Sequence, residues 1–160
     1  MGLLTDAFFI KALRADTTLM ESLPAKDVYD NIAYPDVDME NVALPYIIVN
    51  NEGGQNLQES KDDMQEGPQD QTTVSIRIVA RNHDELADMA LTVRKDIRQY
   101  IIDSQQRQHD GTATDDDRLC PDTYDFHFSE IANDTQKPCY TIIFYYQCVT
   151  SNELYFDDDE

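Results

Sequence analysis

The sequence predicts an α+β domain in which two helices pack on one face of a mainly antiparallel sheet. Residues 3–16 and 85–101 place apolar side chains at helical spacing. Residues 73–78 and 124–129 alternate polar and apolar side chains, as strands with one buried face do. The resulting order, one helix, three strands, a second helix and two strands, is typical of this fold class.

The first helix is predicted from Leu3 to about Asp16, with Thr5 as its N-terminal cap. Leu4, Ala7, Phe8 and Ala12 lie on one helical face. We expect another helical turn over residues 19–23, ending before Pro24, because proline interrupts a helix.

Two strands should follow the first helix. Asp27 to Ile32 can form a short strand, and residues 44–49 form a clearer one, with Pro45 near its start. A proline is least costly at the first position of a strand, where its missing backbone donor matters least.

Residues 52–71 contain almost no apolar side chains and are predicted to form a long, mobile connection. Loops longer than about 12–15 residues are uncommon in compact domains and tend to be functional. This segment is therefore predicted to be a contact arm. Its acids are candidates for lining a channel or an interface: Glu59, Asp62, Asp63 and Glu66.

The second helix has the most secure pattern in the chain. Asn82 and Glu85 have the spacing of a capping box, and apolar residues recur at helical spacing through Ile101. After Asp103 the sequence is polar without a pattern, so residues 104–118 are predicted to be a second loop.

The last two strands, residues 124–129 and 139–149, are expected to form an antiparallel hairpin. The second of them carries apolar residues on both faces, which favours one face against the helices and the other against a neighbouring subunit. The candidate subunit-contact residues are Tyr140, Ile142, Ile143, Phe144, Tyr145 and Tyr146. Residues 1–150 are predicted to form a single domain, and residues 151–160 a solvated acidic tail.

Charge argues against nucleic-acid binding. The 160 residues contain 12 Lys and Arg against 32 Asp and Glu, a formal charge of −20. Affinity for nucleic acid depends on cations that neutralise phosphates, so DNA should be repelled. A basic face is conceivable only on the second helix, which carries Arg94, Lys95 and Arg98.

Cysteine usage and the N-terminus favour an intracellular protein. The three cysteines, Cys120, Cys139 and Cys148, form no CxxC pattern, and the first residues lack the basic region of a signal peptide. Cys139 and Cys148 are expected to be buried, and Cys120 is placed near a loop where it can be exposed. The sequence has no apolar run of the roughly 20 residues that span a bilayer.

No enzyme motif emerges, so a non-enzymatic protein without a cofactor or metal is expected. His83, His109 and His127 are far apart and fit no metal-binding pattern; they are assigned to a helix cap, a polar loop and a strand. Residues 36–40 begin like a calcium loop, but position six is Asn41 and position twelve is Ile47. The acidic runs 115–117 and 157–159 are interpreted as solvated charge.

The ordered elements resemble the small tail-completion and tail-terminator proteins of long-tailed bacteriophages. The resemblance is carried by LLTDAFFIKALRAD at the N-terminus, the segment from Val28 to Val49, and the strand-helix unit TTVSIRIVARNHDELADMALTVRKDI. It covers roughly residues 3–102, and its sharper points are Pro45, Tyr46 and the helix entry at Arg81. The long polar segments 52–71 and 104–118 and the acidic composition depart from the pattern.

This resemblance implies a virion protein, assembled in the host cytoplasm, that forms a ring, commonly a hexamer. Such a ring caps the tail tube and joins the tail to the head connector. The implied partners are further copies of the chain, the tail-tube protein and the connector or neck protein. The family carries no catalytic residues. DNA would pass nearby without specific binding, and a hexamer with a charge of about −120 (6 × −20) would repel it.

Three alternatives remain open. The protein can be another neck or tail part: a head-tail adaptor, a stopper or a tail-tube subunit. It can be an acidic inhibitor that imitates DNA and binds a basic partner. It can also be an enzyme whose metal ligands are scattered along the chain.

Overall fold

The computed structural model describes residues 2–23, 32–33, 43–57, 67–134 and 138–151. A six-stranded sheet has the order β1-β2-β3-β6-β4, with β5 pairing beside β4 along the same edge of β6. The pairing of β1 with β2 is parallel and the others are antiparallel. The strands are β1 (Ile32–Ala33), β2 (Tyr46–Leu57), β3 (Gln69–Ala80), β4 (Thr123–Phe128), β5 (Ala132–Asp134) and β6 (Cys139–Ser151).

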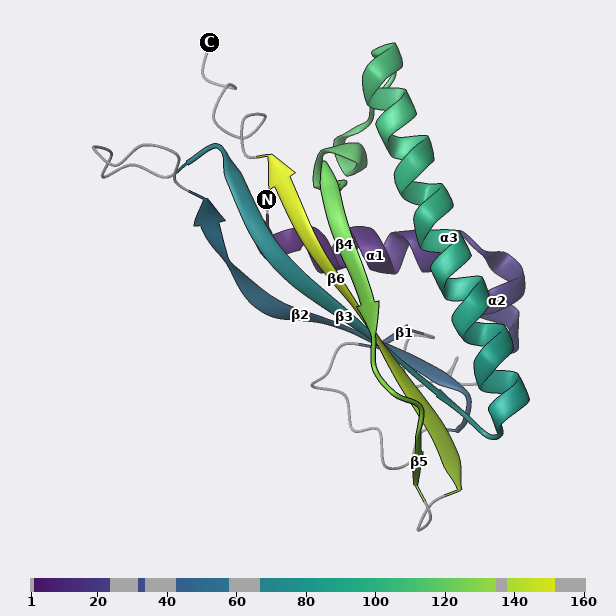
Figure 1. Cartoon of the computed structure of the whole chain (residues 1–160). Coiled ribbons are helices and arrows are strands. Elements are labelled where there is room, and N and C mark those ends of the chain that lie inside the picture. Colours follow the sequence, from purple (N-terminus) through teal and green to yellow (C-terminus); the bar gives the residue numbers. More distant parts are fainter. Residues whose placement is uncertain (1, 24–31, 34–42, 58–66, 135–137, 152–160) are drawn as a thin grey trace.

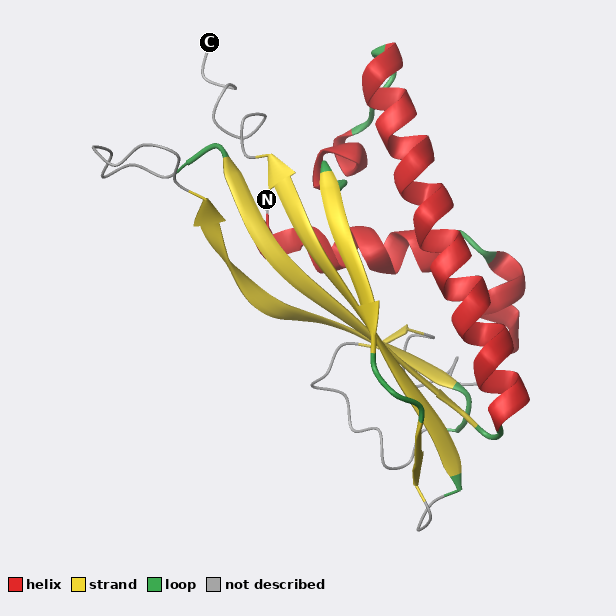
Figure 2. Cartoon of the chain, viewed as in Figure 1, coloured by secondary structure: helices red, strands yellow, loops and turns green. Residues whose placement is uncertain are grey.

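All helices lie on one side of the sheet (Figure 1). They are α1 (Thr5–Arg14), α2 (Thr17–Ser22) and α3 (His83–Asp110), with the short 3-10 helices η1 (Gly2–Leu4) and η2 (Asp115–Leu119). Helix α1 contacts β2, β3 and α3, and α3 contacts β3 and β6. Figure 2 shows the two layers, red helices against yellow strands. The predicted α+β class with a mainly antiparallel sheet is therefore confirmed.

The core fills the space between the two layers. Helix α1 contributes Phe8, Phe9 and Leu13, and alternate residues of β3 and β6 face them. The Phe9 and Tyr146 rings lie 5.0 Å apart and join α1 to β6. Because a buried large apolar side chain stabilises a fold by about 1.5–3 kcal/mol, these side chains account for much of the attachment of the helices to the sheet.

The N-terminal region differs from the prediction in two ways. Helix α1 ends at Arg14, two residues before the predicted end, and the expected further turn before Pro24 is the separate helix α2, which begins at Thr17. Asp16 separates them, because its carboxylate accepts a hydrogen bond from the Leu19 N–H at 3.1 Å and caps α2. The expected cap at Thr5 is wrong: Leu4 occupies that position, and Thr5 is fully buried within the first turn.

The predicted mobile connection at 52–71 is strand at both of its ends. Strand β2 continues to Leu57 and β3 already begins at Gln69, while residues 58–66 lie outside the described part of the chain. Polar pairs hold these strand ends together: Gln55 bonds Gln71 at 3.2 Å, and Asn56 bonds Asp70 at 2.9 Å. A strand that is exposed on both faces needs no apolar alternation, and the sequence pattern therefore missed it.

The predicted loop at 104–118 is also wrong. Helix α3 runs two turns further, to Asp110, and ends at Gly111, whose φ of 75° suits a left-handed helix cap. The predicted start is confirmed, since Asn82 Oδ1 accepts the Glu85 N–H at 2.9 Å. The Glu85 carboxylate bonds the backbone N–H of Arg81 at 3.1 Å.

The remaining strands agree with the predictions in type. The strand expected at 44–49 is β2, which begins one residue after Pro45, and the expected C-terminal hairpin is the antiparallel pair β4 and β6. Strand β5 was not anticipated. Of the strand expected at 27–32, only Ile32 lies within the described residues, in β1.

Candidate interaction surfaces

The face of the sheet opposite the helices carries a row of half-buried side chains. We call it the open face and define it by Ile143, Tyr145 and Val149 of β6 with their cross-strand neighbours. Tyr145 lies opposite Ser75 on one side and His127 on the other. The His127 and Tyr145 rings are stacked, with centroids 4.9 Å apart and planes 13° apart. This face therefore presents apolar and aromatic surface that none of the described helices covers (Figure 1).

The alternation of β6 divides the predicted subunit-contact residues into two groups. Ile143 and Tyr145 lie on the open face and are half-buried. Ile142, Phe144 and Tyr146 face the helices and are buried in the core of the same chain. Tyr140 is half-buried, and its ring lies edge-on to His83 at 6.1 Å. Only the first group is placed for contact with a neighbour, because the second is already enclosed.

The predicted channel acids Glu59, Asp62, Asp63 and Glu66 lie outside the described residues, as do the calcium-like segment 36–40 and the tail 152–160. The structure therefore assigns them no position.

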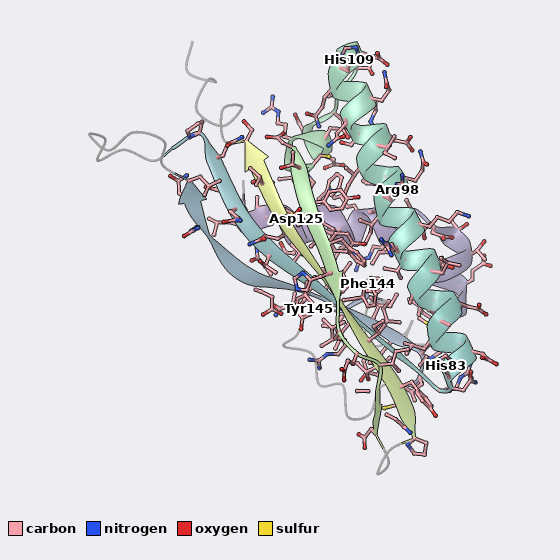
Figure 3. All side chains as sticks on the ribbon, in the orientation of Figure 1. His83, Arg98, His109, Asp125, Phe144 and Tyr145 are labelled. Atoms are coloured by element: carbon pink, nitrogen blue, oxygen red, sulfur yellow. The ribbon has the colours of Figure 1, made fainter. Side chains whose placement is uncertain are left out.

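A hollow of about 400 Å³ lies between α3 and β4. Arg94 and Arg98 line it from α3, Tyr124, Asp125 and Phe126 from β4, and Tyr146 from β6. The Arg94 guanidinium lies over the Phe126 ring, 4.3 Å from its centroid. Figure 3 shows Arg98 and Asp125 on the two elements that flank the hollow. We call it the arginine cleft.

Two polar features of the arginine cleft lack partners. Among the described residues, neither Arg94 nor Arg98 forms an ion pair. The Tyr146 hydroxyl is buried and has no hydrogen-bond partner within that same part of the chain. Burial, followed by the neighbouring Tyr124, raises the pKa of Tyr146 well above its usual range, so the hydroxyl keeps its proton. The sequence signal for this site was the pair of arginines four residues apart, which share one helix face.

Two carboxyl groups meet where α2 begins beside α3. Burial, together with a hydrogen bond and repulsion from Asp16, raises the pKa of Asp96 to about 7. The same hydrogen bond lowers the pKa of Asp16. Both line a hollow of about 250 Å³ with Tyr100 and Asp103. Two carboxyl groups that share a hydrogen bond repel each other when both are ionised. A proton shared between them is therefore the expected state near neutral pH.

One buried carboxylate attaches η2 to α3. Asp117 is only 2% exposed and accepts hydrogen bonds from the Ser104 hydroxyl at 2.6 Å and from Arg107 at 2.7 and 2.9 Å. The Thr114 N–H donates to it at 2.9 Å. The Arg107 guanidinium holds the pKa of Asp117 well below its usual range. The acidic run 115–117 was expected to be solvated, which is wrong for Asp117 because α3 extends far enough to bury it.

Among the described residues, no group of three or more His, Cys, Asp or Glu side chains is placed to hold a metal ion. His83 and His109 lie at opposite ends of α3, and His127 lies on β4 (Figure 3). His109 was expected in a loop and instead lies in the last helical turn. Cys120 was placed where it can be exposed but is buried, and burial raises its thiol pKa to about 11.

Cys139 and Cys148 are buried and free, as expected. Burial raises the pKa of the Cys148 thiol to about 12, which keeps the reactive thiolate scarce at neutral pH. In the described part of the chain, none of the helices combines the length and the apolar character that crossing a membrane requires.

No family model matches the chain, and no curated protein sequence matches it.

Proposed function

We propose that this protein is a structural component of a tailed-phage virion, a ring-forming protein that caps the tail tube and joins the tail to the head connector. The observation that carries the proposal is the open face of the sheet. Helices cover only the other face, and Ile143 and Tyr145 stay half-buried on a surface that a second chain can cover. The order of elements described above, which resembles the tail-completion proteins, supports the same conclusion.

A closed ring needs two different surfaces on each subunit, because successive subunits meet head to tail. The open face is one candidate. The outer side of α3 is the other, since its Leu91 is 68% exposed and its Ile102 is 47% exposed. Helix α3 lies on the side of the sheet away from the open face (Figure 1). The two residues are eleven residues, about three turns, apart and therefore lie on the same side of α3.

Charge suits a protein through which DNA passes. Six copies would carry about −120 (6 × −20), and acids that line a bore would keep DNA from adhering. A ring whose bore is neutral or basic would contradict this part of the proposal, and its acids would then serve solubility.

The decisive experiment is electron microscopy of particles assembled without this protein. We expect abnormally long tails, or tails and heads that remain separate, because nothing ends the tube or provides the docking surface. Normal virions would overturn the proposal.

The purified protein distinguishes the nearest alternative. A tail-tube subunit polymerises alone into tubes, whereas a terminator forms closed rings only or remains monomeric until it meets a tube. Mass photometry and negative-stain microscopy of the full chain separate these outcomes.

A further inference from the structure

The arginine cleft brings two arginines together in an acidic protein. The sequence has 32 acids against 12 basic side chains, and the described Lys11, Arg81, Arg107 and Arg118 each form an ion pair with one of those acids. Arg94 and Arg98 nevertheless form no ion pair with any described residue and instead flank the same hollow. Asp125 also borders the cleft but forms no ion pair with either arginine. The two positive charges favour a carboxylate held between the two guanidiniums.

The wall of the cleft favours an aromatic neighbour for that carboxylate. Tyr124 and Phe126 of β4 meet Tyr146, with ring centroids 5.6 Å and 5.0 Å from it. Phe128 continues the same side of the strand and is 57% exposed. Aromatic pairs with this spacing contribute about 0.5–1.5 kcal/mol beyond the area they bury.

Strand β4 forms the edge of the sheet beside the cleft. Strand β4 is the last in the sheet order, so one side of its backbone pairs with no described strand. Natural edge strands are usually protected by charge, proline or a covering element. Here the edge carries Phe128, and Ile131 follows it at 44% exposure. An extended peptide can lie along such an edge.

The Tyr146 hydroxyl is the second, independent sign of a ligand. The residue is 2% exposed and lines the cleft, and its hydroxyl has no hydrogen-bond partner among the described residues. Leaving a buried polar group without a partner costs about 1–3 kcal/mol. A peptide carbonyl or carboxylate in the cleft would accept a hydrogen bond from this hydroxyl.

We propose that the arginine cleft binds the C-terminal segment of a second copy of this chain, residues 152–160. Their sequence, NELYFDDDE, sets two aromatic residues directly before four acids and matches the rings and the guanidiniums of the cleft. The described chain ends with β6 at Ser151, and nine further residues reach at most about 30 Å when extended, enough to cross to a neighbour. The choice of a second copy rests on the proposed ring, whereas the recognition chemistry does not.

The test uses a fluorescein-labelled NELYFDDDE peptide titrated with the purified full chain and followed by fluorescence anisotropy. We expect saturable binding that weakens with salt, because the contacts are charged. Arg98→Gln and Arg94→Gln should each weaken binding about tenfold. Lys95→Gln, an exposed cation on the same helix that does not line the cleft, is the matched control and should leave affinity unchanged.

Circular dichroism establishes that each variant is folded, and a peptide with its three aspartates replaced by asparagine should bind at least tenfold more weakly. Absence of binding to both the full chain and a chain that lacks residues 152–160, or an equal loss in the Lys95 control, overturns the proposal. Binding that appears only after residues 152–160 are removed, at a concentration at which the full chain is monomeric, shows that the segment binds within one chain, and this overturns the second-copy assignment. Particle phenotypes test the ring separately, so either proposal can fail alone.

Discussion

Asp16 and Asp96 form a carboxyl pair, and the Asp96 carboxyl keeps its proton up to a pH of about 7. Because Asp96 in the folded protein keeps its proton up to a pH of about 7, whereas an unfolded aspartate loses it near pH 4, the stability from this proton is complete at low pH. That stability is lost as the pH rises through about 7.

Asp96→Asn should therefore gain stability relative to the native chain as the pH rises from about 5 to about 8, by roughly 1 kcal/mol once the partial exposure of the pair is taken into account. Urea unfolding at both pH values measures the gain. Asp88→Asn, an exposed acid on the same helix, should show no such pH-dependent difference. A gain that is equal at both pH values would mean that Asp96 and Asp16 share no proton.

Tyr146 allows a second prediction for a single residue. Since its buried hydroxyl lacks a partner among the described residues, Tyr146→Phe keeps the ring contacts and removes the polar group. We expect the free protein to become about 1 kcal/mol more stable in thermal or urea unfolding. Tyr124→Phe, whose ring lies closer to the surface, should change stability less. A destabilised Tyr146→Phe would show that the hydroxyl has a partner in the free chain.

At the scale of elements, the final two turns of α3 depend on a contact with η2, the short helix that follows α3 in the chain. Asp117 joins η2 to Ser104 and Arg107, and its carboxylate is buried. Asp117→Asn should cost about 2 kcal/mol, less than a fully buried ion pair because the Arg107 side chain is 38% exposed. Hydrogen exchange should become faster over residues 104–110. Asp115→Asn, exposed in the same 3-10 helix, is the control.

The pH dependence of this contact has the opposite sign to that of Asp96. The pKa of Asp117 is depressed in the folded protein, so its contribution is present above about pH 4 and is lost as the pH falls further. Native stability measured at pH values from about 6 down to 3 should fall more steeply than that of the Asp117→Asn variant.

The sequence predicted the elements whose stability comes from apolar periodicity. The start of α3 at Asn82 and the alternation of β3 and β6 were predicted because a buried face leaves a pattern. The end of α3 and the polar halves of β2 and β3 were missed, because polar pairs such as Asn56 with Asp70 leave no apolar periodicity in the sequence. The arginine cleft was visible only as two arginines on one helix face, because the β4 wall comes from a distant part of the chain.

At the scale of the molecule, the open face of the sheet decides the assembly. Ile143→Glu should block ring formation and capping of tail tubes, because it places a charge on the proposed interface. The fold should tolerate it, since residue 143 lies opposite Arg77 and an opposite charge is favourable there. Ala113→Glu, exposed beyond α3, is the control. Ring formation by electron microscopy and folding by circular dichroism are the two measurements, and intact rings in the Ile143 variant would exclude the open face from the interface.

The strand order has a consequence for the synthesis of the chain. Strand β6 lies between β3 and β4, yet it is the last described strand to leave the ribosome. Until Cys139–Ser151 has emerged, β3 and the apolar side of α3 lack the strand that they pack against. At a synthesis rate of about 5–20 residues per second, this interval lasts a few seconds. A nascent chain that stalls before β6 is therefore expected to need chaperones. A truncated messenger RNA that lacks the codons for β6 should yield a chain that is degraded, not a smaller folded protein.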